Sequence, residues 1–201
     1  MVRDADRTKK QLLAAATAEF AKYGIAGARV DRIAESAGCN KAMIYAYFGD
    51  KDRLFDAVFS AQVGSVWDEV AFTATDLPAY VGRLFDYYED HPQTVRLSTW
   101  YRLERPAGDP LLAVVDSNKT KLAKIARAQQ DGILPTHYAP VELLALAISI
   151  AATWASVTPE LGAAAPADRT RRRHTVVDAV TCLITPDRQG TPVNRQATPA
   201  S

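Results

Sequence analysis

Apolar residues recur every three or four positions along most of this chain, and no segment alternates apolar and polar residues long enough to predict a β-strand. Leu12, Ala16 and Phe20 begin the pattern, and the segment "DRTRRRHTVVDAVTCLI" closes it. The chain has 201 residues, of which 48% are hydrophobic, so it can bury a core of its own. The sequence therefore predicts an all-α protein with about nine helices and no internal repeat.

Glycines and capping residues divide the first part of the chain into four helices. A first helix is predicted to end near Gly24 and a second at Gly38, because glycine is a common stop signal after a helix. Asn40 is a suitable N-cap for a third helix that extends to about Phe48, and Asp50 caps a fourth. A short helix, a glycine turn and another short helix satisfy the demands of a helix-turn-helix.

Proline and glycine also separate the helices predicted further along. The fourth helix has an inner apolar stripe that extends to Trp67. Later helices are expected over Leu77–Tyr88, Pro92–Pro106, from Leu111 to a stop at Gly132, and over Val141–Val157 and Asp168–Ile184. Beyond these, Pro, Gly, Thr, Gln and Asn dominate, which is typical of a mobile tail. The expected organisation is an N-terminal domain over 1–53, a second helical domain over 54–184 and a flexible tail over 185–201.

Composition indicates the cellular setting. The net charge is only +1, but residues 1–53 hold ten Lys or Arg against seven Asp or Glu, so a small basic excess lies in the first domain. Two cysteines are too few for a secreted disulfide scaffold of this size. The opening "MVRDADRTKK" does not lead into the apolar run of a signal peptide, and Val141–Val157 is shorter than the roughly 20 residues of a membrane helix. We expect a cytoplasmic protein with no membrane partner.

The third helix combines lysine, small residues and aromatics in "KAMIYAYF". At helical spacing Ile44 and Phe48 point inward together, while Ala42 and Ala46 point outward. In a helix-turn-helix this second helix lies in the major groove of DNA, and a face of small residues lets it lie close to the bases.

Polar groups around this face suit the DNA backbone. Lys41, Lys51 and the hydroxyls of Tyr45 and Tyr47 can reach phosphate oxygens, which receive most protein–DNA hydrogen bonds. The alternative interpretation is that these aromatics belong to an ordinary core and the glycines to ordinary helix ends, since helix-turn-helix patterns also occur by chance in all-α proteins.

The segment from Thr8 to Val58 resembles, nearly position for position, the DNA-binding domain of the tetracycline-repressor (TetR) family of bacterial regulators. The shared features are an Ala-rich first helix with Phe20, the pair Tyr23-Gly24, the run Ile33-Ala34-x-x-Ala37-Gly38, Lys41, the run Ile44-Tyr45-x-Tyr47-Phe48, and Lys51 followed by Leu54. The combination covers about a quarter of the chain and is much more specific than a helix-turn-helix pattern alone.

The resemblance implies an all-helical homodimer that regulates transcription from a palindromic operator in double-stranded DNA. It also implies a C-terminal domain that binds a small effector and dimerises through its last two helices. By matching position, the implied DNA-binding residues are Arg29, Val30, Asn40, Lys41, Ala42, Met43, Tyr45, Ala46, Tyr47 and Lys51.

Three positions depart from the family pattern. Arg29 stands where Ser or Thr usually caps the second helix, so that cap is expected to be missing, although the arginine could itself meet a phosphate. Met43 and Ala46 stand where Thr and His are frequent, so two common hydrogen bonds to DNA are absent. Contacts with thymine methyl groups are expected to take their place.

The second domain is rich in aromatics, and small-molecule pockets are mostly apolar with a few polar groups. Either Arg96 or Glu104 could supply such a polar group. The candidate effector-binding residues are Phe59, Val63, Trp67, Tyr88, Arg96, Trp100, Leu103, Glu104 and Trp154.

Other motifs favour ordinary structure. The three histidines are far apart and lack ligand spacing, so we expect no metal site, and no cofactor motif is found. A packed, inert Cys39 is favoured over a redox switch. For "RTRRRH" a solvated basic face is favoured over a second nucleic-acid patch.

The leading hypothesis is a repressor that a small apolar or aromatic effector releases from its operator. One alternative is an effectorless DNA-binding dimer whose second domain serves only dimerisation or the docking of a protein partner. Another is an α-helical enzyme, which is disfavoured because no set of nucleophile, base and orienting group can be assembled. The first two hypotheses differ in whether a small molecule changes operator affinity.

Overall fold

The computed structural model of the chain describes residues 2–105 and 110–185. Within these ranges there are no strands, and the regular elements are eleven α-helices, nine of them with at least seven residues, and one 3₁₀ turn. The all-α prediction is therefore confirmed, and so is the predicted number of helices. None of the described helices combines the length and apolar character needed to cross a membrane. Beyond Thr185, the predicted tail lies outside the described residues.

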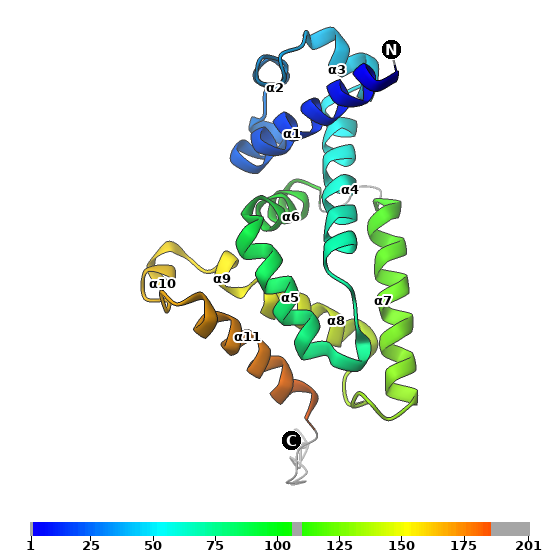
Figure 1. Cartoon of the computed structure of the whole chain (residues 1–201), viewed down its shortest axis with the longest axis vertical. Helices are drawn as coiled ribbons and strands as arrows, with labels where there is room; N and C mark the ends of the chain where they lie inside the picture. The colour runs from blue at the N-terminus through cyan, green and yellow to red at the C-terminus, as the bar shows by residue number, and fades with distance from the viewer. Residues whose placement is uncertain (1, 106–109, 186–201) are drawn as a thin grey trace, which may run out of the picture.

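Four helices build the N-terminal domain. These are α1 (Val2–Gly27), α2 (Val30–Ala37), α3 (Lys41–Phe48) and the start of α4 (Lys51–Glu69). The other elements are η1 (Ala74–Asp76), α5 (Leu77–Asp90), α6 (Pro92–Glu104), α7 (Leu112–Gln130), α8 (Pro140–Ala151), α9 (Thr153–Ser156), α10 (Pro159–Ala163) and α11 (Arg169–Ile184). Because α4 passes from one domain into the other without a break (Figure 1), the proposed boundary after residue 53 falls inside a continuous helix.

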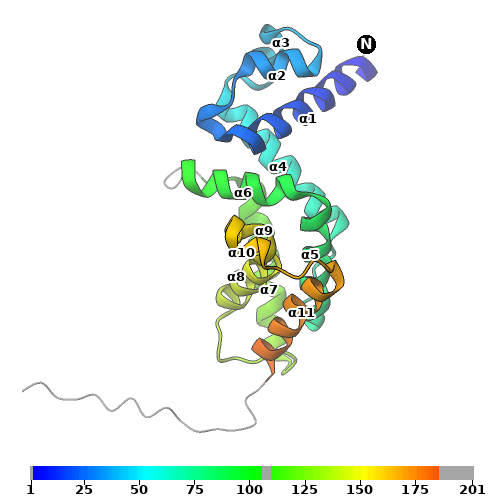
Figure 2. The same ribbon diagram turned by 90° about the vertical axis from the view of Figure 1, so that its left-hand side faces the viewer.

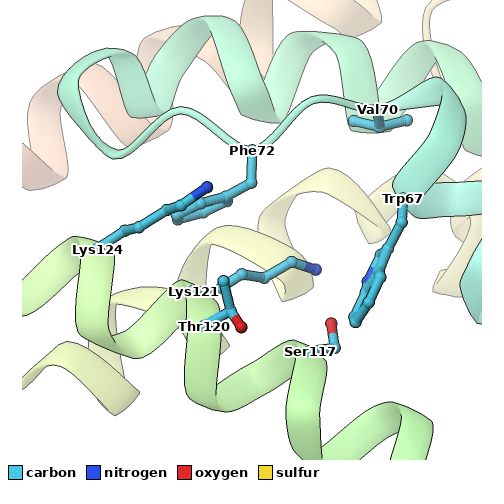
Figure 3. A pocket seen from close by; sticks show the side chains of 7 residues that line it. All are labelled: Trp67, Val70, Phe72, Ser117, Thr120, Lys121 and Lys124. Atoms are coloured by element: carbon cyan, nitrogen blue, oxygen red, sulfur yellow. The ribbon is translucent and has the colours of Figure 1, made fainter.

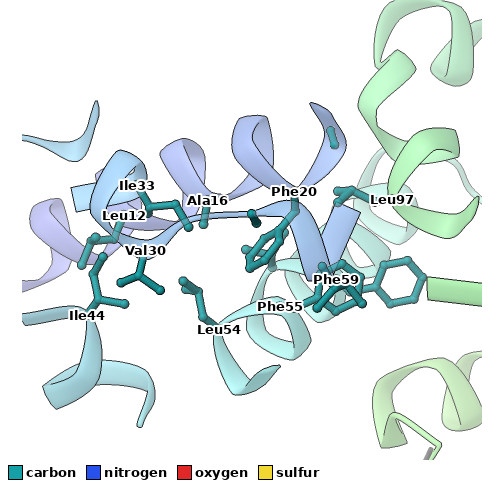
Figure 4. Packing of buried hydrophobic residues seen from close by; sticks show 14 of the residues in the cluster. Leu12, Ala16, Phe20, Val30, Ile33, Ile44, Leu54, Phe55, Phe59 and Leu97 are labelled. Carbon is teal, nitrogen blue, oxygen red and sulfur yellow. The ribbon is translucent and has the colours of Figure 1, made fainter. Parts of the chain in front are cut away.

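One hydrophobic core joins the N-terminal domain to α6 (Figure 4). The ring of Phe20 meets the ring of Phe55 edge-on, with 5.2 Å between centroids. Phe59 stacks on Tyr101 of α6 at 4.6 Å. Leu97, also on α6, is fully buried in the same cluster. The core of the N-terminal domain is therefore completed by a helix that comes much later in the chain.

A second core surrounds α5. Tyr80, Leu84 and Phe85 of this helix are almost fully buried and pack against apolar residues of α8 and α11. A third, smaller cluster centres on Ile125 of α7 and joins that helix to α8 and η1. The two views show α5, α8 and α11 as neighbouring helices at the end of the molecule away from α2 and α3 (Figure 2).

Three of the four arginines of "RTRRRH" are ion-paired, so the basic face predicted on α11 is exposed but partly neutralised. The ion pairs join Arg169 to Asp90, Arg172 to Glu89 and Arg173 to Asp86. The reason is that α5 places its acidic residues directly against the first turns of α11. Arg169, Arg171 and His174 nevertheless keep the expected exposed positions within this run.

The apolar segment Val141–Val157, predicted as one helix, is broken at Ala152, where φ is −86° and ψ is 0°. The chain then forms the separate short helix α9. The indole N–H of Trp154 donates to the carbonyl oxygen of Arg172 at 3.2 Å, which fixes the turned segment against α11. The segment after Ala152 is therefore held by its contact with α11 and does not continue α8 as one straight helix.

A kink at Gly24 fits the end of α1 against α6. Gly24 has φ 73° and ψ −178°, a region that essentially only glycine occupies. After the kink, the carboxylate of Glu104 accepts hydrogen bonds from the backbone N–H groups of Ile25 at 3.2 Å and Ala26 at 2.6 Å. Glu104 therefore caps the last turn of α1 from another domain.

We predict that Gly24→Ala destabilises the protein more than Gly38→Ala. A Cβ at Gly24 would meet the Glu104 carboxylate and would lie 3.0 Å from the Trp100 ring, whereas nothing lies within 4 Å of one at Gly38. Gly38→Ala should therefore cost only the left-handed backbone penalty of about 1–2 kcal/mol. Chemical unfolding followed by circular dichroism measures the free energy of unfolding of both variants.

Gly64→Ala is the matched control, because nothing lies within 4 Å of its Cβ and it sits inside α4 with an ordinary φ. It should raise the free energy of unfolding by up to about 1 kcal/mol, the difference in helix propensity. Equal stability of Gly24→Ala and Gly38→Ala would contradict the packing of α6 on the kink.

Candidate nucleic-acid interface and ligand cavities

The turn between α2 and α3 is fixed by backbone hydrogen bonds. Gly38 ends α2 with φ 66° and ψ 33°, and its N–H donates to the carbonyl of Glu35 at 3.1 Å. The N–H of Cys39 donates to the carbonyl of Ala34 at 3.0 Å, which completes a Schellman-type helix end. The side chain of Cys39 packs against the core, as predicted. These contacts determine the direction in which α3 begins.

The inner side of α3 anchors it to the core. Asn40 is its N-cap, as predicted, and accepts a hydrogen bond from the N–H of Met43 at 2.9 Å. Ile44 is fully buried and Phe48 is half-buried. With this side held, the opposite side of α3 faces away from the protein.

The outward side of α3 carries small residues between tyrosines. Ala42 and Ala46 are exposed, while Met43 is half-buried. Tyr45 and Tyr47 are 44% and 40% exposed. The alanines let the helix approach another surface closely, and the tyrosines offer hydroxyls beside it, as a helix in the major groove requires.

Two lysines flank this face. Lys41 Nζ lies 2.9 Å from Asp31 Oδ1, and the hydrogen bond to Asp31 raises the pKa of Lys41. Both side chains are largely exposed, so the pair is weak and a DNA phosphate can replace the carboxylate. Lys51 Nζ donates to the carbonyls of Ala26 and Ala28 at 3.2 and 3.4 Å. An ammonium has three donors, so one remains for a phosphate.

Glu19 of α1 takes over the role of the missing cap on α2. The Arg29 side chain makes no capping hydrogen bond, in agreement with its departure from the family pattern. Instead, Glu19 Oε1 accepts hydrogen bonds from the N–H of Arg29 and from Nε of Arg32, both at 2.8 Å. Burial raises the pKa of the Glu19 carboxyl, but these hydrogen bonds outweigh it, and the pKa is lowered. The carboxylate therefore stays ionised near the N-terminus of α2, where the helix dipole favours a negative charge.

Val30 is a correction to the predicted DNA-binding residues. Its side chain is only 8% exposed and belongs to the hydrophobic core. The reason is that Val30 starts the apolar stripe of α2 that continues with Ile33 and Ala34. Its side chain therefore supports the helix-turn-helix from inside.

The predicted effector residues do not form one cavity. Phe59 is 6% exposed, and both it and Val63 pack in the core shared with α6. Leu103 lies on the surface and is 65% exposed. Because core packing and helix orientation decide these positions, the three residues are not brought together around a ligand.

Three of the predicted effector residues instead tie α6 to α1. Arg96 Nε and Trp100 Nε1 both donate to the carbonyl of Ala21, at 2.8 and 3.4 Å. Glu104 binds the backbone beyond the kink of α1, as described above. These groups therefore form an inter-domain junction, which sequence analysis did not anticipate.

The aromatic candidates line several hollows, two of which adjoin and share Val95, Thr99, Arg102 and Ser156. Trp67, predicted on the inner stripe of α4, is 41% exposed and lines a cavity of about 200 Å³ between α4 and α7 (Figure 3). Tyr88 lines a hollow of about 380 Å³ beside α6 and α8. Next to it, Arg96 and Trp100 line another of about 330 Å³. Trp154 lines a fourth, of about 420 Å³, near α10.

Sequence analysis missed the α7 side of the cavity beside Trp67, which is formed by Ser117, Thr120, Lys121 and Lys124. Their spacing of three or four residues placed them on one helix face, but only the tertiary structure shows that this face meets the end of α4. Within residues 2–105 and 110–185, no group of three or more His, Cys, Asp or Glu side chains could hold a metal ion.

Two family models match the chain, one for each domain. The model described as "Bacterial regulatory proteins, tetR family" matches residues 12–58. The model described as "Tetracyclin repressor-like, C-terminal domain" matches residues 76–181. The chain belongs to the TetR family. It is therefore a transcriptional regulator and not an enzyme, and its helix-turn-helix domain binds DNA.

Relatives of this TetR-family regulator include repressors. It is 36% identical over 161 residues to the HTH-type transcriptional repressor SCO4008 of Streptomyces coelicolor, covering 79% of this chain and 83% of that one. It is 34% identical over 102 residues to the HTH-type transcriptional repressor NicS of Pseudomonas putida, covering 47% and 48%. The crystal structure of the transcriptional regulator SCO4942 from Streptomyces coelicolor matches with a TM-score of 0.78 and 40% identity over 88% of this chain and 97% of that one.

In this TetR-family regulator we predict that Lys41→Ala weakens binding to all DNA sequences, because a phosphate contact does not depend on sequence. The slope of log affinity against log salt should fall by about 0.9 per subunit. Fluorescence anisotropy with a DNA site selected from a random pool measures both. Lys119→Ala removes the same charge from an exposed position on α7 and should change neither.

The outward alanines are tested in the same titration. Ala46→Glu should weaken binding more than Lys41→Ala, because it pushes a bulky anion toward the floor of the groove. Ala123→Glu, on the exposed side of α7, is the control and should have little effect. If Ala46→Glu bound the selected site normally, α3 would not be the helix that reads the groove.

Proposed function

We propose that the protein is a cytoplasmic, homodimeric repressor that a small apolar or aromatic effector releases from a palindromic operator. The observation that carries the proposal is the core shared between the domains. Leu97 and Tyr101 of α6 pack among residues of α1 and α4. A ligand that moves α4 or α6 would therefore also move α3. The repressor names of the relatives SCO4008 and NicS support the direction of regulation.

On the operator, α3 would lie in the major groove with Ala42 and Ala46 toward the bases. Their exposure and the anchoring of the opposite side of α3 support this orientation. Lys41, Tyr45 and Tyr47 would then contact phosphates at the edges of the groove. Of the other residues matched to the family pattern, Met43 would approach thymine methyl groups, and Arg29 and Lys51 would reach the flanking backbone.

The exposed sides of α8 and α11 are the proposed dimer interface. On α8, Val141 and Leu146 are 59% and 37% exposed although both are apolar, and on α11 Ala179 and Cys182 are exposed. The two helices pack against each other, so their outer faces adjoin. A two-fold arrangement would let each subunit bind one half of a palindrome. The C-terminal domain of this family is typical of a dimerising regulator.

We predict that Leu146→Glu dissociates the dimer, because it would place a charge in an apolar interface. Sedimentation equilibrium at micromolar concentration measures the change. Leu112→Glu is the matched control, since Leu112 is 76% exposed at the start of α7, outside the proposed interface. Unchanged association of the Leu146→Glu variant, with its helical spectrum intact, would place the interface elsewhere.

The effector mechanism requires two states of the dimer, one with the two α3 helices about 34 Å apart for successive major grooves and one with them displaced. A ligand shifts this balance only by binding one state better, so the coupling must be reciprocal. Movement could reach the DNA-binding domain through α6 as well as through α4. This second route is supported by hydrogen bonds to the backbone of α1 from Arg96, Trp100 and Glu104 of α6.

We predict that an apolar or aromatic compound found by tryptophan fluorescence lowers operator affinity about 5- to 150-fold, the usual range of allosteric coupling. The operator should lower the affinity for that compound by the same factor. Fluorescence titrations with and without the selected DNA measure both changes. Trp67, Trp100 and Trp154 all lie beyond the DNA-binding domain, so they report on the second domain.

The alternative function is an effectorless DNA-binding dimer. One observation favours it, namely that the predicted effector residues are divided between the core, the inter-domain junction and several hollows. A compound that bound the C-terminal domain and left operator affinity unchanged would support this alternative.

A further inference from the structure

The cavity between the end of α4 and the middle of α7 has two chemically different sides (Figure 3). Trp67, Val70 and Phe72, from α4 and the loop after it, form an apolar wall. The opposite side comes from α7, where Ser117 and Lys121 point into the space between Trp67 and Phe72. A site with this division suits a ligand that has one apolar part and one polar part.

The ammonium of Lys121 has no counter-charge among the residues that the structure describes. Within the described part of the chain, Lys121 forms no ion pair and no hydrogen bond. Burial lowers the pKa of Lys121, and no neighbouring carboxylate offsets this effect. A surface lysine usually extends its ammonium into water while its stem covers apolar atoms. Here the ammonium is instead partly removed from water, so an anion that joined it would be bound strongly.

Ser117 adds a second polar group that has no hydrogen-bond partner in the described ranges. Its residue is only 3% exposed, and its hydroxyl points toward Trp67 (Figure 3). Several other helical hydroxyls donate to the carbonyl four residues earlier, as Thr120 does to Asp116 at 3.0 Å. Ser117 has no such bond to another described residue. An ammonium and a hydroxyl in one cavity are the donors that a carboxylate accepts.

We propose that this cavity binds a small organic acid, with its carboxylate at Lys121 and Ser117 and its ring or short aliphatic body against Trp67 and Phe72. The volume of about 200 Å³ fits this class of ligand. An apolar cavity of about 150 Å³ holds benzene, which leaves room here for a carboxylate on a single ring. Lys124, the second lysine on the cavity wall, disfavours a cation.

The proposal rests on the proposed function, because the acid would be the effector of the repressor. The apolar wall belongs to the last turn of α4 and the loop that follows it, whereas the polar wall belongs to α7. A bound acid would therefore link the two elements. The 19 residues of α4 span about 28 Å, and Lys51 at the other end donates to carbonyls of Ala26 at the end of α1 and Ala28 before α2. Movement of the cavity end would tilt α4 and displace the helix-turn-helix.

The test compares acids with neutral compounds of the same shape. Benzoate, phenylacetate and hexanoate are titrated into the full chain by calorimetry, each beside its primary amide. We expect at least one acid to bind tenfold or more tightly than its amide, which is the value of a charge-assisted hydrogen bond. Lys121→Met should abolish this preference. Lys124→Met, which removes a charge from the exposed rim of the same cavity, should keep most of it.

Two further measurements separate binding from a structural role. Without ligand, Lys121→Met should melt at the same temperature as the unchanged chain or higher, because it removes an unpaired, partly buried charge. Trp67→Phe should remove most of the fluorescence response to the acid while calorimetric binding persists. A lower melting temperature for Lys121→Met would assign the lysine a role in stability and contradict the proposal.

The remaining outcomes distinguish the acid site from its role as the effector site and from the proposed function. If none of the three acids binds more tightly than its amide, or if Lys121→Met keeps the preference, the acid site is overturned. A different compound that releases the operator would then still support the proposed function. If an acid binds through Lys121 but leaves operator affinity unchanged, the acid site stands and its role as effector is overturned.

Discussion

The packing of α6 into the core of the N-terminal domain is the contact on which the rest of the structure depends. Leu97 is fully buried among residues of α1 and α4, and Tyr101 stacks on Phe59. Burial of side chains of this size contributes about 1.5–3 kcal/mol each. Because α6 belongs by sequence to the C-terminal domain, the DNA-binding domain is not an independent unit here, and its position follows that of α4 and α6 together.

Carboxylates from distant positions stabilise the ends of helices at this junction. Glu19 bonds the N–H of Arg29 at the start of α2, and Glu104 bonds Ile25 and Ala26 after the kink of α1. Both replace caps that local residues do not supply. Glu104 couples α1 to α6 through strong, charge-assisted hydrogen bonds, so a change at α6 has a direct route to the helix-turn-helix.

Most of the helix-turn-helix could be predicted from the sequence because its signals are local. Gly38 ends α2, Asn40 caps α3 and Asp50 caps α4, each within a few residues of the bonds it makes. The candidate ligand residues could not be predicted in the same way. Trp67 was among the predicted effector residues and Lys121 was not, because the two come from segments more than fifty residues apart and meet only across two helices.

The sequence by itself determined the helical class, the limits of the short helices and the chemical character of the outward face of α3, because hydrogen bonds and periodicity act over three or four residues. The tertiary structure alone decided that the apolar segment breaks after Ala151 and that three of the four arginines of α11 are paired with α5. It also decided which face of α7 meets the end of α4. These features depend on neighbours brought together by packing. The spacing of residues along one helix shows which face is apolar but does not identify the helix that packs against it.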